Sequence, residues 1–169
     1  MDRSREHTAA FTGHRRYDGE CDDALRAVVR ELYGWGFRVF WSGMALGFDL
    51  AAAEAVLELR ERMPDVRLIA AVPFQGQEAR FSQSDRERFS RVLSAADVVE
   101  VLSPVYHRGC YAVRNDFLVD HARVLVAWYD GSPGGTHYTV RRAMRRGLEI
   151  LDLHPAASAL PAFAPTLFG

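Results

Sequence analysis

The chain has 169 residues, with 21 Lys and Arg against 22 Asp and Glu, which gives a formal net charge of −1 at pH 7. Hydrophobic residues make up 49% and charged residues 25%, the balance of one ordinary globular domain. A net charge this close to zero excludes a general electrostatic attraction to nucleic acid or to an anionic membrane, so we expect neither as a partner.

Short apolar runs, rich in β-branched and aromatic residues, alternate with amphipathic segments along the chain. The expected elements, in chain order, are a strand at 8–13, a helix at 21–36, a strand at 37–43, a helix at 48–63, a strand at 66–74, a helix at 84–96, a strand at 97–103, a helix at 111–122, a strand at 124–130, a helix at 136–147 and a strand at 148–154.

Six strands that alternate with five helices predict an α/β protein with a Rossmann-like sandwich, in which helices cover both faces of a mainly parallel sheet. The run at 66–74 is nearly all apolar, as expected for a strand that is covered on both faces. Pro64 ends the second helix, Ser82 or Ser84 caps the third, and Gly147 closes the fifth.

We expect residues 1–155 to form this single domain and residues 156–169 to be a Pro- and Ala-rich tail. The apolar tail residues have no periodic pattern, so we expect them to dock on a partner surface in a homo-oligomer, most simply a dimer. These residues are Leu160, Phe163, Leu167 and Phe168.

The two cysteines, Cys21 and Cys110, provide neither a disulfide framework nor the spacing of a metal site. The N-terminus lacks the apolar core of a signal peptide, and no apolar run is long enough to cross a bilayer. We therefore expect a cytoplasmic protein without a bound metal.

Open parallel sheets bind ligands beyond the carboxyl ends of their strands, so the turns at these ends carry the candidate site. The candidate ligand-binding residues follow the first, second, third and fifth strands or lie early in the fourth and fifth helices. They are Thr12, Gly13, His14, Arg15, Ser42, Gly43, Met44, Gly47, Asp49, Pro73, Phe74, Arg114, Asn115, Asp130, Gly134, Gly135, Thr136 and Thr139.

Two of these turns, Ser42–Gly47 and Gly134–Thr136, are rich in glycine and lead directly into helices. Glycine lets backbone N–H groups approach a ligand, and a helix N-terminus adds partial positive charge, so both turns suit a phosphate. Either turn alone is equally consistent with a plain helix entry. Two such turns at one sheet edge favour phosphate binding.

Three of the polar candidates have a structural and a functional interpretation. Asp49 is either an N-cap or dipole partner of its helix, or a hydrogen-bond acceptor for a ribose hydroxyl. Thr136 caps the fifth helix, contacts phosphate, or does both. His14 is either an incidental loop residue or, with Arg15 beside it, an anion contact.

Arg114 lies in a helix whose apolar residues Val113, Phe117 and Leu118 are expected to face the sheet. Its guanidinium either meets phosphate with two parallel hydrogen bonds or pairs internally with Asp116 or Asp120; we favour phosphate. Four arginines on the fifth helix, Arg141, Arg142, Arg145 and Arg146, are expected to form a solvated face.

Several stretches taken together resemble the YpsA-like family (DUF1273) of the SLOG superfamily, which also contains the LOG phosphoribohydrolases and the DprA DNA-processing proteins. They are "TGHR", "SGMALGFDLAAAE", "PFQGQEARFSQSD", "AADVV", "YAVRNDFLVDHA" and "YDGSPGGTHYTVRRA". The resemblance covers roughly residues 9 to 153, and the order of the motifs makes it specific.

The resemblance implies a Rossmann-like domain that binds a nucleotide or nucleotide-derived ligand, such as NAD, ADP-ribose or a nucleoside phosphate, and it is consistent with a sensor. It places Ser42, Gly43, Gly47 and Asp49 in a turn shared with DprA, and Arg114 where LOG enzymes have a catalytic arginine. LOG enzymes carry a catalytic Glu at the end of P-G-G-x-G-T-x-x-E. Counted from Pro133, that position is Arg141 here, so we do not expect phosphoribohydrolase activity.

The sequence is also consistent with two alternatives. A nucleotide hydrolase that cleaves an N-glycosidic or phosphodiester bond would need a base from Asp49, Glu54, His14 or Asp130. DprA-like binding of single-stranded DNA is disfavoured by the near-neutral charge and by the lack of a basic stripe rich in aromatic residues.

Overall fold

The structure is a computed structural model that describes residues 4–157. The tail residues expected to mediate self-association, Leu160, Phe163, Leu167 and Phe168, lie outside the described residues. Within the described part, no helix is both long enough and apolar enough to span a membrane.

All six expected strands and five expected helices are present in the expected order. The elements are η1 (Arg5–His7), β1 (Thr8–Gly13), α1 (Asp22–Gly34), β2 (Val39–Ser42), α2 (Phe48–Arg62), β3 (Arg67–Val72), η2 (Gln77–Arg80), α3 (Gln83–Ala95), β4 (Val98–Val101), α4 (Cys110–His121), β5 (Val124–Trp128), α5 (Gly135–Arg145) and β6 (Glu149–Asp152). The two short 3₁₀ helices η1 and η2 were not expected.

The six strands form one parallel sheet in the order β4-β3-β2-β1-β5-β6. The first four strands are added one after another in one direction, and the chain then returns to place β5 on the other side of β1. The strand order therefore reverses between β1 and β5. Doubly wound sheets bind ligands in the crevice at such a switch point.

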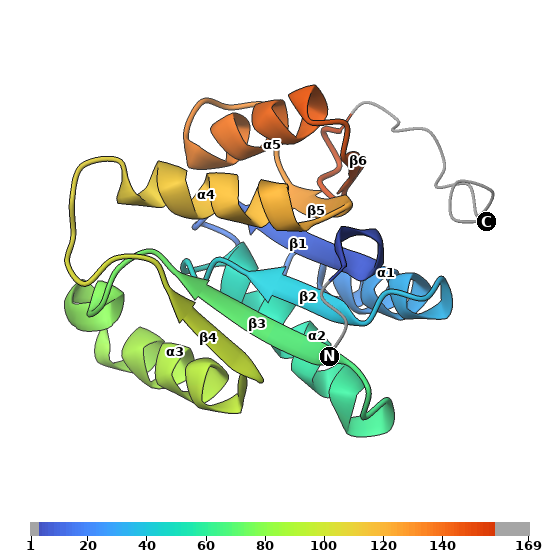
Figure 1. The fold of residues 1–169 in the computed structure, drawn as a ribbon, viewed down its shortest axis with the longest axis horizontal. Helices are drawn as coiled ribbons and strands as arrows, with labels where there is room; N and C mark the ends of the chain where they lie inside the picture. Colours follow the sequence, from blue (N-terminus) through green and yellow to red (C-terminus); the bar gives the residue numbers. More distant parts are fainter. Residues whose placement is uncertain (1–3, 158–169) are drawn as a thin grey trace.

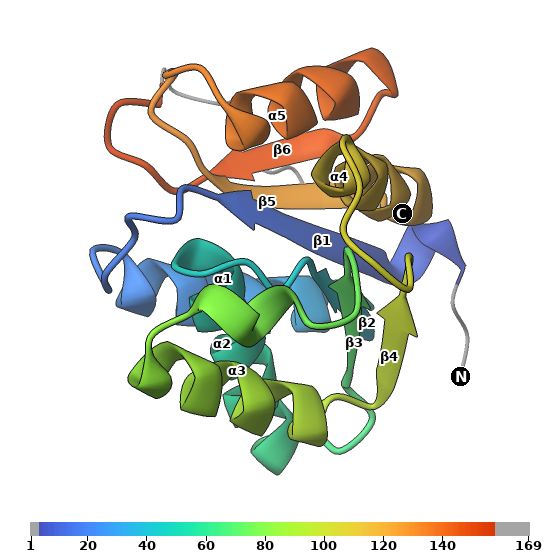
Figure 2. The same cartoon turned by 90° about the vertical axis from the view of Figure 1, so that its left-hand side faces the viewer.

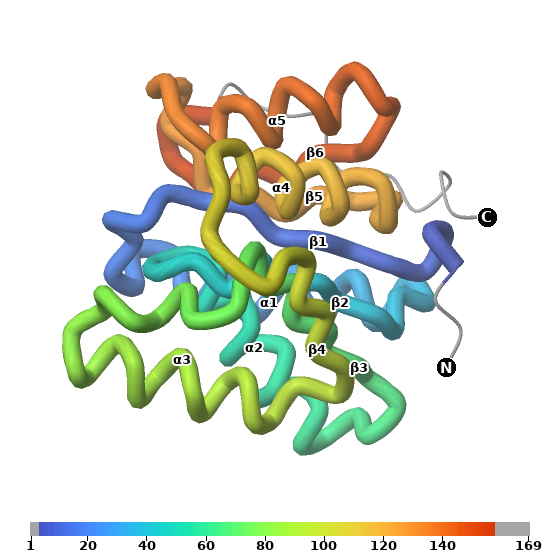
Figure 3. The backbone as a smooth tube through the Cα atoms, turned by 60° about the vertical axis from the view of Figure 1, so that its left-hand side comes forward, coloured from blue at the N-terminus to red at the C-terminus, as the bar shows by residue number. Residues whose placement is uncertain are grey.

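Helices α1, α2 and α3 cover one face of the sheet, and α4 and α5 cover the other (Figures 1 and 2). The connection at 102–109, between β4 and α4, carries the chain from one side of the sheet to the other (Figure 3). The α/β Rossmann-like sandwich predicted from the sequence is therefore confirmed.

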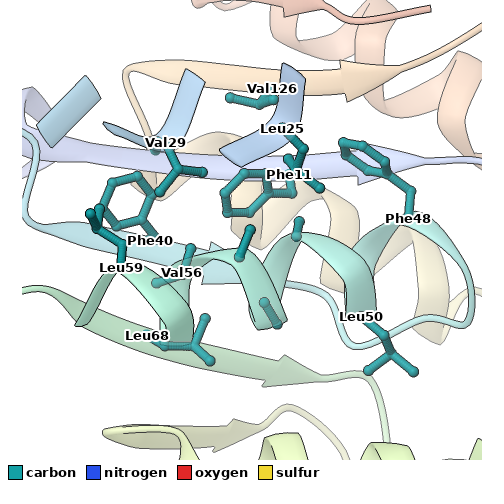
Figure 4. Packing of buried hydrophobic residues seen from close by; sticks show 14 of the residues in the cluster. Phe11, Leu25, Val29, Phe40, Phe48, Leu50, Val56, Leu59, Leu68 and Val126 are labelled. Atoms are coloured by element: carbon teal, nitrogen blue, oxygen red, sulfur yellow. The ribbon is translucent and has the colours of Figure 1, made fainter. Parts of the chain in front are cut away.

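The larger core lies between the sheet and the layer formed by α1, α2 and α3 (Figure 4). Phe11 of β1 is fully buried there, with its ring stacked 6.2 Å from that of Phe40 and edge-on to Phe48 at 6.5 Å between centroids. Phe48 is the first residue of α2, so this contact fixes the start of α2 against the end of β1. The entry turn of α2 is thereby held at the switch point.

Helix α4 differs from the sequence interpretation in the face that it buries. Val113 is half exposed, whereas Cys110, Arg114 and Leu118, spaced four residues apart, are buried. This spacing is the i, i+4 stripe of one helix face. The sheet-facing stripe of α4 thus contains an arginine at the site edge.

At the start of α3, the structure distinguishes between the two expected caps. The Ser82 hydroxyl accepts a hydrogen bond from the Asp85 backbone N–H at 3.2 Å, so Ser82 is the N-cap.

The close packing of β1 against α2 leads to a stability prediction. A Cβ added to Gly13 would lie 2.4 Å from the Phe48 side chain, whereas one on Gly34, at the end of α1, would meet no atom within 4 Å. We expect Gly13→Ala to lower the free energy of unfolding by about 1–3 kcal/mol through overpacking. The matched Gly34→Ala change should leave it unchanged or raise it by up to about 1 kcal/mol. Denaturant unfolding measures both, and equal effects would contradict the packing described here.

Candidate functional site

A cavity of about 240 Å³ opens at the carboxyl ends of β1 and β5, where the strand order reverses. It is bordered by the loop after β1, the entry turn of α2, the first turns of α4 and the N-terminus of α5. The lining residues are Thr12, Gly13, His14, Arg15, Ala45, Asp49, Tyr111, Arg114, Asn115, Gly135 and Thr136.

The turn between β2 and α2 is fixed by its own hydrogen bonds. The Ser42 hydroxyl donates to the Asp49 carbonyl at 2.9 Å and accepts from the Met44 N–H at 3.2 Å. Met44 adopts a left-handed φ of 61°, and its carbonyl accepts from the buried Gln77 side chain at 3.2 Å. A non-glycine residue in this conformation is held by its surroundings, so the turn is a rigid wall of the cavity.

Gly47 has a steric function in this turn. Its φ is +79°, and a Cβ there would lie 2.4 Å from the Arg15 carbonyl oxygen. The following N–H, from Phe48, donates to the His14 carbonyl at 3.4 Å. The glycine therefore lets the α2 turn approach the β1 loop, and the Phe48 N–H is used in a bond within the protein.

Asp49 is buried in the first turn of α2, but it is not the N-cap, which is Gly47. Its Oδ2 accepts the Ala45 N–H at 3.3 Å, across the entry turn. Burial raises the pKa of Asp49 to about 6, although the Arg114 guanidinium, the Ala45 hydrogen bond and Arg15 all oppose that rise. The cavity thus contains a carboxyl group that titrates close to neutral pH.

Arg114 is buried at the cavity and bonds inside the protein, but to neither of the two acids considered from the sequence. Its Nη1 donates to the Gly43 carbonyl, and its Nε donates to Asn115 Oδ1 at 2.7 Å. A Cβ on Gly43 would lie 2.9 Å from both Arg114 Cδ and Asp49 Oδ2, so the two charged side chains meet over this glycine. Burial lowers the pKa of Arg114, and the Asp49 charge opposes that effect.

The acids Asp116 and Asp120 bind other partners. Asp116 accepts from the Tyr138 hydroxyl at 2.7 Å and pairs with Arg142 at 3.0 Å. Asp120 pairs with Arg142 and Arg146, both at 3.1 Å. The arginine face of α5 is therefore partly engaged with α4 rather than fully solvated.

The N-terminus of α5 reaches the cavity through Gly135 and Thr136. Its N-cap, Gly134, has a φ of 139°, and no side chain in the described chain caps the helix, so Thr136 is not its cap. The Thr139 hydroxyl donates to the Gly135 carbonyl at 2.8 Å, inside the helix. The uncapped N–H groups at this end give the cavity the positive end of a helix dipole.

His14 and Asp130 form a polar pair at one side of the cavity. His14 Nε2 lies 2.9 Å from Asp130 Oδ1, and Arg16 pairs with the other oxygen. Hydrogen bonds from Ser132 and Arg16 hold the pKa of Asp130 well below its usual range. Asp130 therefore orients His14 but does not itself line the cavity.

The structure brings most of the expected residues to one place. Thr12, Gly13, His14, Arg15, Asp49, Arg114, Asn115, Gly135 and Thr136 all line the cavity. Ser42, Gly43, Met44 and Gly47 form its supporting turn, while Pro73 is buried at the end of β3 and Phe74 lies beside Tyr111. Sequence reasoning missed two lining residues, Ala45 and Tyr111. The position of Tyr111 three residues before Arg114 puts both on one helix face and could have identified it.

Two of the residues considered as a catalytic base, Glu54 and Asp130, lie outside the cavity lining. Glu54 faces a separate groove between α1 and α2, where Arg88 donates to it at 2.9 Å. Arg141 is exposed on α5. If the G-T pair of the LOG motif is aligned with Gly135-Thr136, the motif's glutamate position falls on Thr139. Neither this alignment nor the one from Pro133 therefore puts an acidic residue there. No group of three His, Cys, Asp or Glu residues in the described part of the chain is placed to hold a metal.

The family model described as the YspA SLOG family (YpsA) matches residues 20–150. A UPF0398 protein from Shouchella clausii (strain KSM-K16) is 36% identical over 118 residues, which are 68% of this chain and 61% of that protein. The uncharacterized SPbeta prophage-derived protein YoqJ of Bacillus subtilis (strain 168) is 32% identical over 151 residues, covering 79% of this chain and 86% of YoqJ.

Two solved DprA structures share the fold. DprA from Streptococcus pneumoniae has a TM-score of 0.62 at 19% identity, over 85% of this chain and 48% of that one. DprA from Helicobacter pylori, described as having a unique single-stranded DNA binding mode, has a TM-score of 0.65 at 18% identity, over 96% and 71%. The chain spans about half the length of the first of these proteins.

The Helicobacter pylori structure corrects one expectation from the sequence. Nucleic acid was discounted because the net charge of −1 provides no general attraction. The same fold occurs in a protein described as binding single-stranded DNA. Net charge averages over the whole surface, whereas binding depends on local charge at the site, so the expectation is wrong.

The buried carboxyl group leads to a pH prediction. The pKa of Asp49 is about 6 in the folded protein, against about 3.9 in an unfolded chain. Because the folded protein keeps the proton to higher pH, the contribution of Asp49 to stability is greatest below about pH 4 and is lost as pH rises through about 6.

Asp49→Asn removes this titration. As the pH rises from 4 to 6, the free energy of unfolding of the variant should therefore increase relative to that of the unsubstituted protein. Denaturant unfolding at several pH values compares the two proteins. Burial also raises the pKa of Asp152, but this residue is present in both proteins and cancels in the difference. A difference that is constant from pH 4 to pH 7 would contradict the assignment.

Proposed function

The chain belongs to the YspA SLOG family, and we propose that it binds the phosphate of a nucleotide or nucleotide-derived ligand in the cavity between β1 and β5. The observation that carries the proposal is the meeting of the uncapped α5 N-terminus, Arg15 and Arg114 around one cavity. Backbone N–H groups at a helix N-terminus and guanidinium groups are both well suited to phosphate oxygens.

The two arginines have different roles in this proposal. Arg114 already donates to Gly43 and Asn115, so its buried charge supplies a fixed positive potential at the cavity floor. Arg15 is exposed and lies over the Tyr111 ring, with its Cζ 5.2 Å from the ring centroid. Because Arg15 is exposed, its N–H donors can meet a ligand that enters from solvent.

Asp49 favours a sugar phosphate over inorganic phosphate. A carboxylate beside an anion is unfavourable, yet Asp49 lines the same cavity as both arginines. Carboxylate oxygens accept hydrogen bonds from hydroxyl groups, and ribose provides such groups next to its phosphate. The acidic and basic groups together thus suit a ribose phosphate.

The size of the cavity limits what it can enclose. Sites that enclose a drug-sized ligand measure roughly 300–1,000 Å³. At about 240 Å³, this cavity is suited to the phosphate and ribose, with the remainder of the ligand outside. Single-stranded DNA is a second candidate, because it repeats a sugar phosphate and a DprA of the same fold is described as binding it.

Calorimetric titration with AMP and with adenosine tests the proposal. We expect AMP to bind and adenosine, which lacks phosphate, to bind at least about tenfold more weakly, because charged hydrogen bonds each contribute roughly 1.5–3 kcal/mol. Arg15→Gln should weaken AMP binding by about tenfold or more. The matched control is Arg141→Gln, an exposed arginine on α5 outside the cavity lining, which should change little.

The same titration is repeated with a short oligodeoxynucleotide. If the oligodeoxynucleotide binds and AMP does not, the ligand of the cavity is a sugar phosphate of single-stranded DNA. If AMP, NAD, ADP-ribose and the oligonucleotide all fail to bind, or if both arginine variants lose affinity equally, the proposal is wrong.

The proposed function is binding, without release of the base. Neither candidate for the LOG glutamate position is acidic: Arg141 is exposed, and Thr139 bonds within its helix. We therefore expect no free adenine when the protein is incubated with AMP and the products are separated by chromatography. Adenine release at about 1 per second or faster, a typical enzymatic rate, would show that another residue supplies the chemistry.

A further inference from the structure

Three aromatic side chains gather beside the cavity; we call Phe74, Tyr106 and Tyr111 the aromatic cluster. Phe74 follows β3, Tyr106 lies in the 102–109 connection, and Tyr111 is in the first turn of α4. The ring centroids of Phe74 and Tyr106 are 5.4 Å apart, those of Phe74 and Tyr111 are 6.0 Å apart, and those of Tyr106 and Tyr111 are 6.4 Å apart.

The aromatic cluster continues the cavity outwards. Tyr111 belongs to the cavity lining, and the guanidinium carbons of Arg15 and Arg114 lie 5.2 and 5.8 Å from its ring centroid. Phe74 and Tyr106 extend from Tyr111 over the two adjoining loops. The rings therefore lie beside Arg15, the arginine that we propose contacts the phosphate.

The two loops that carry Phe74 and Tyr106 are tied together. The Gln75 N–H donates to the Ser103 carbonyl at 3.0 Å, and the Ser103 hydroxyl donates to the Val105 carbonyl at 2.7 Å. The connection that carries Tyr106 is the one that crosses between the two helical layers (Figure 3). The loops that carry the aromatic cluster are thus held by a backbone hydrogen bond and by the Ser103 hydroxyl.

Tyr106 is not accounted for by core packing. The residue is 61% exposed, although its ring contacts both other members of the cluster. A core aromatic loses most of its surface to neighbours, and the hydrophobic stabilisation scales with the area removed from water. The open surface of Tyr106 offers a flat apolar area beside a polar cavity.

We propose that the aromatic cluster, through Tyr106, stacks the nucleobase of a ligand whose sugar phosphate occupies the adjoining cavity. This inference rests on the proposed function and specifies its ligand as one that bears a base. Aromatic side chains stack on any base because every base presents a π face. The cluster therefore contributes affinity for nucleotides, or for the nucleotides of a strand, over simple sugar phosphates.

Calorimetric titration with AMP and ribose 5-phosphate separates this inference from the proposed function, since ribose 5-phosphate has a hydroxyl group at C1 where AMP has the base. We expect AMP to bind more tightly than ribose 5-phosphate, and Tyr106→Ala to weaken AMP binding by about tenfold. Ribose 5-phosphate binding should stay within about twofold. Tyr106→Phe keeps the ring and should retain AMP affinity.

The control variant is Met144→Ala, which truncates an apolar residue that is 60% exposed near the C-terminal end of α5, outside the aromatic cluster and the cavity lining, and should leave both affinities unchanged. Melting temperatures within a few degrees of the unsubstituted protein show that the Tyr106 variants are folded. A short oligodeoxyadenylate tests whether the stacked base belongs to a DNA strand. If Tyr106→Ala weakens binding of the oligodeoxyadenylate but not of AMP, the cluster stacks the bases of a strand.

The stacking inference is overturned if ribose 5-phosphate binds as tightly as AMP and Tyr106→Ala changes no affinity, including that of the oligodeoxyadenylate. The proposed function survives that result. If no phosphate compound binds the unsubstituted protein, both fail together.

Discussion

The buried guanidinium of Arg114 is the interaction on which the candidate site depends. It comes from α4 on one side of the sheet and donates to the Gly43 carbonyl at the end of β2, so it ties α4 to the entry turn of α2. Asp49 approaches it over Gly43, and burial raises the pKa of this carboxyl group to about 6 in spite of the arginine. A buried charge without its partners would be costly, so the turn, the helix and the carboxyl group hold one another in place.

The same constraint determines how the glycines of the site act. Gly13 makes room for Phe48, Gly43 for Arg114 and Asp49, and Gly47 for the carbonyl of Arg15. These glycines bring three segments of backbone and side chain close together at the switch point. The second glycine turn, at Gly134 and Gly135, leads into α5, whose first residues Gly135 and Thr136 line the cavity directly. The two turns look alike in sequence, but one builds the wall and the other is suited to contact the ligand.

The alternation of apolar runs and amphipathic helices was sufficient to predict the fold, because strand order and handedness leave few ways to arrange six parallel strands. The sequence also identified most of the cavity lining, because the carboxyl ends of parallel strands share one edge.

The sequence could not identify the partners of Arg114, since Gly43 is 71 residues away and contributes only a backbone carbonyl. Tyr106 and Tyr111 were missed for a related reason: their contact with Phe74 depends on the path of the 102–109 connection, which has no periodic pattern. The assignment of Val113 to the sheet face was wrong because its neighbour Arg114 takes that place, and hydrophobicity alone does not anticipate a buried arginine.

The central claim is that the cavity between β1 and β5 holds a ligand phosphate at the N-terminus of α5. A crystal structure of the protein with AMP tests it most directly. The account predicts the phosphate oxygens within hydrogen-bond distance of the Gly135 or Thr136 N–H groups and of the Arg15 guanidinium. A well-ordered AMP bound elsewhere, for example in the groove between α1 and α2, or a phosphate turned away from α5, would contradict it.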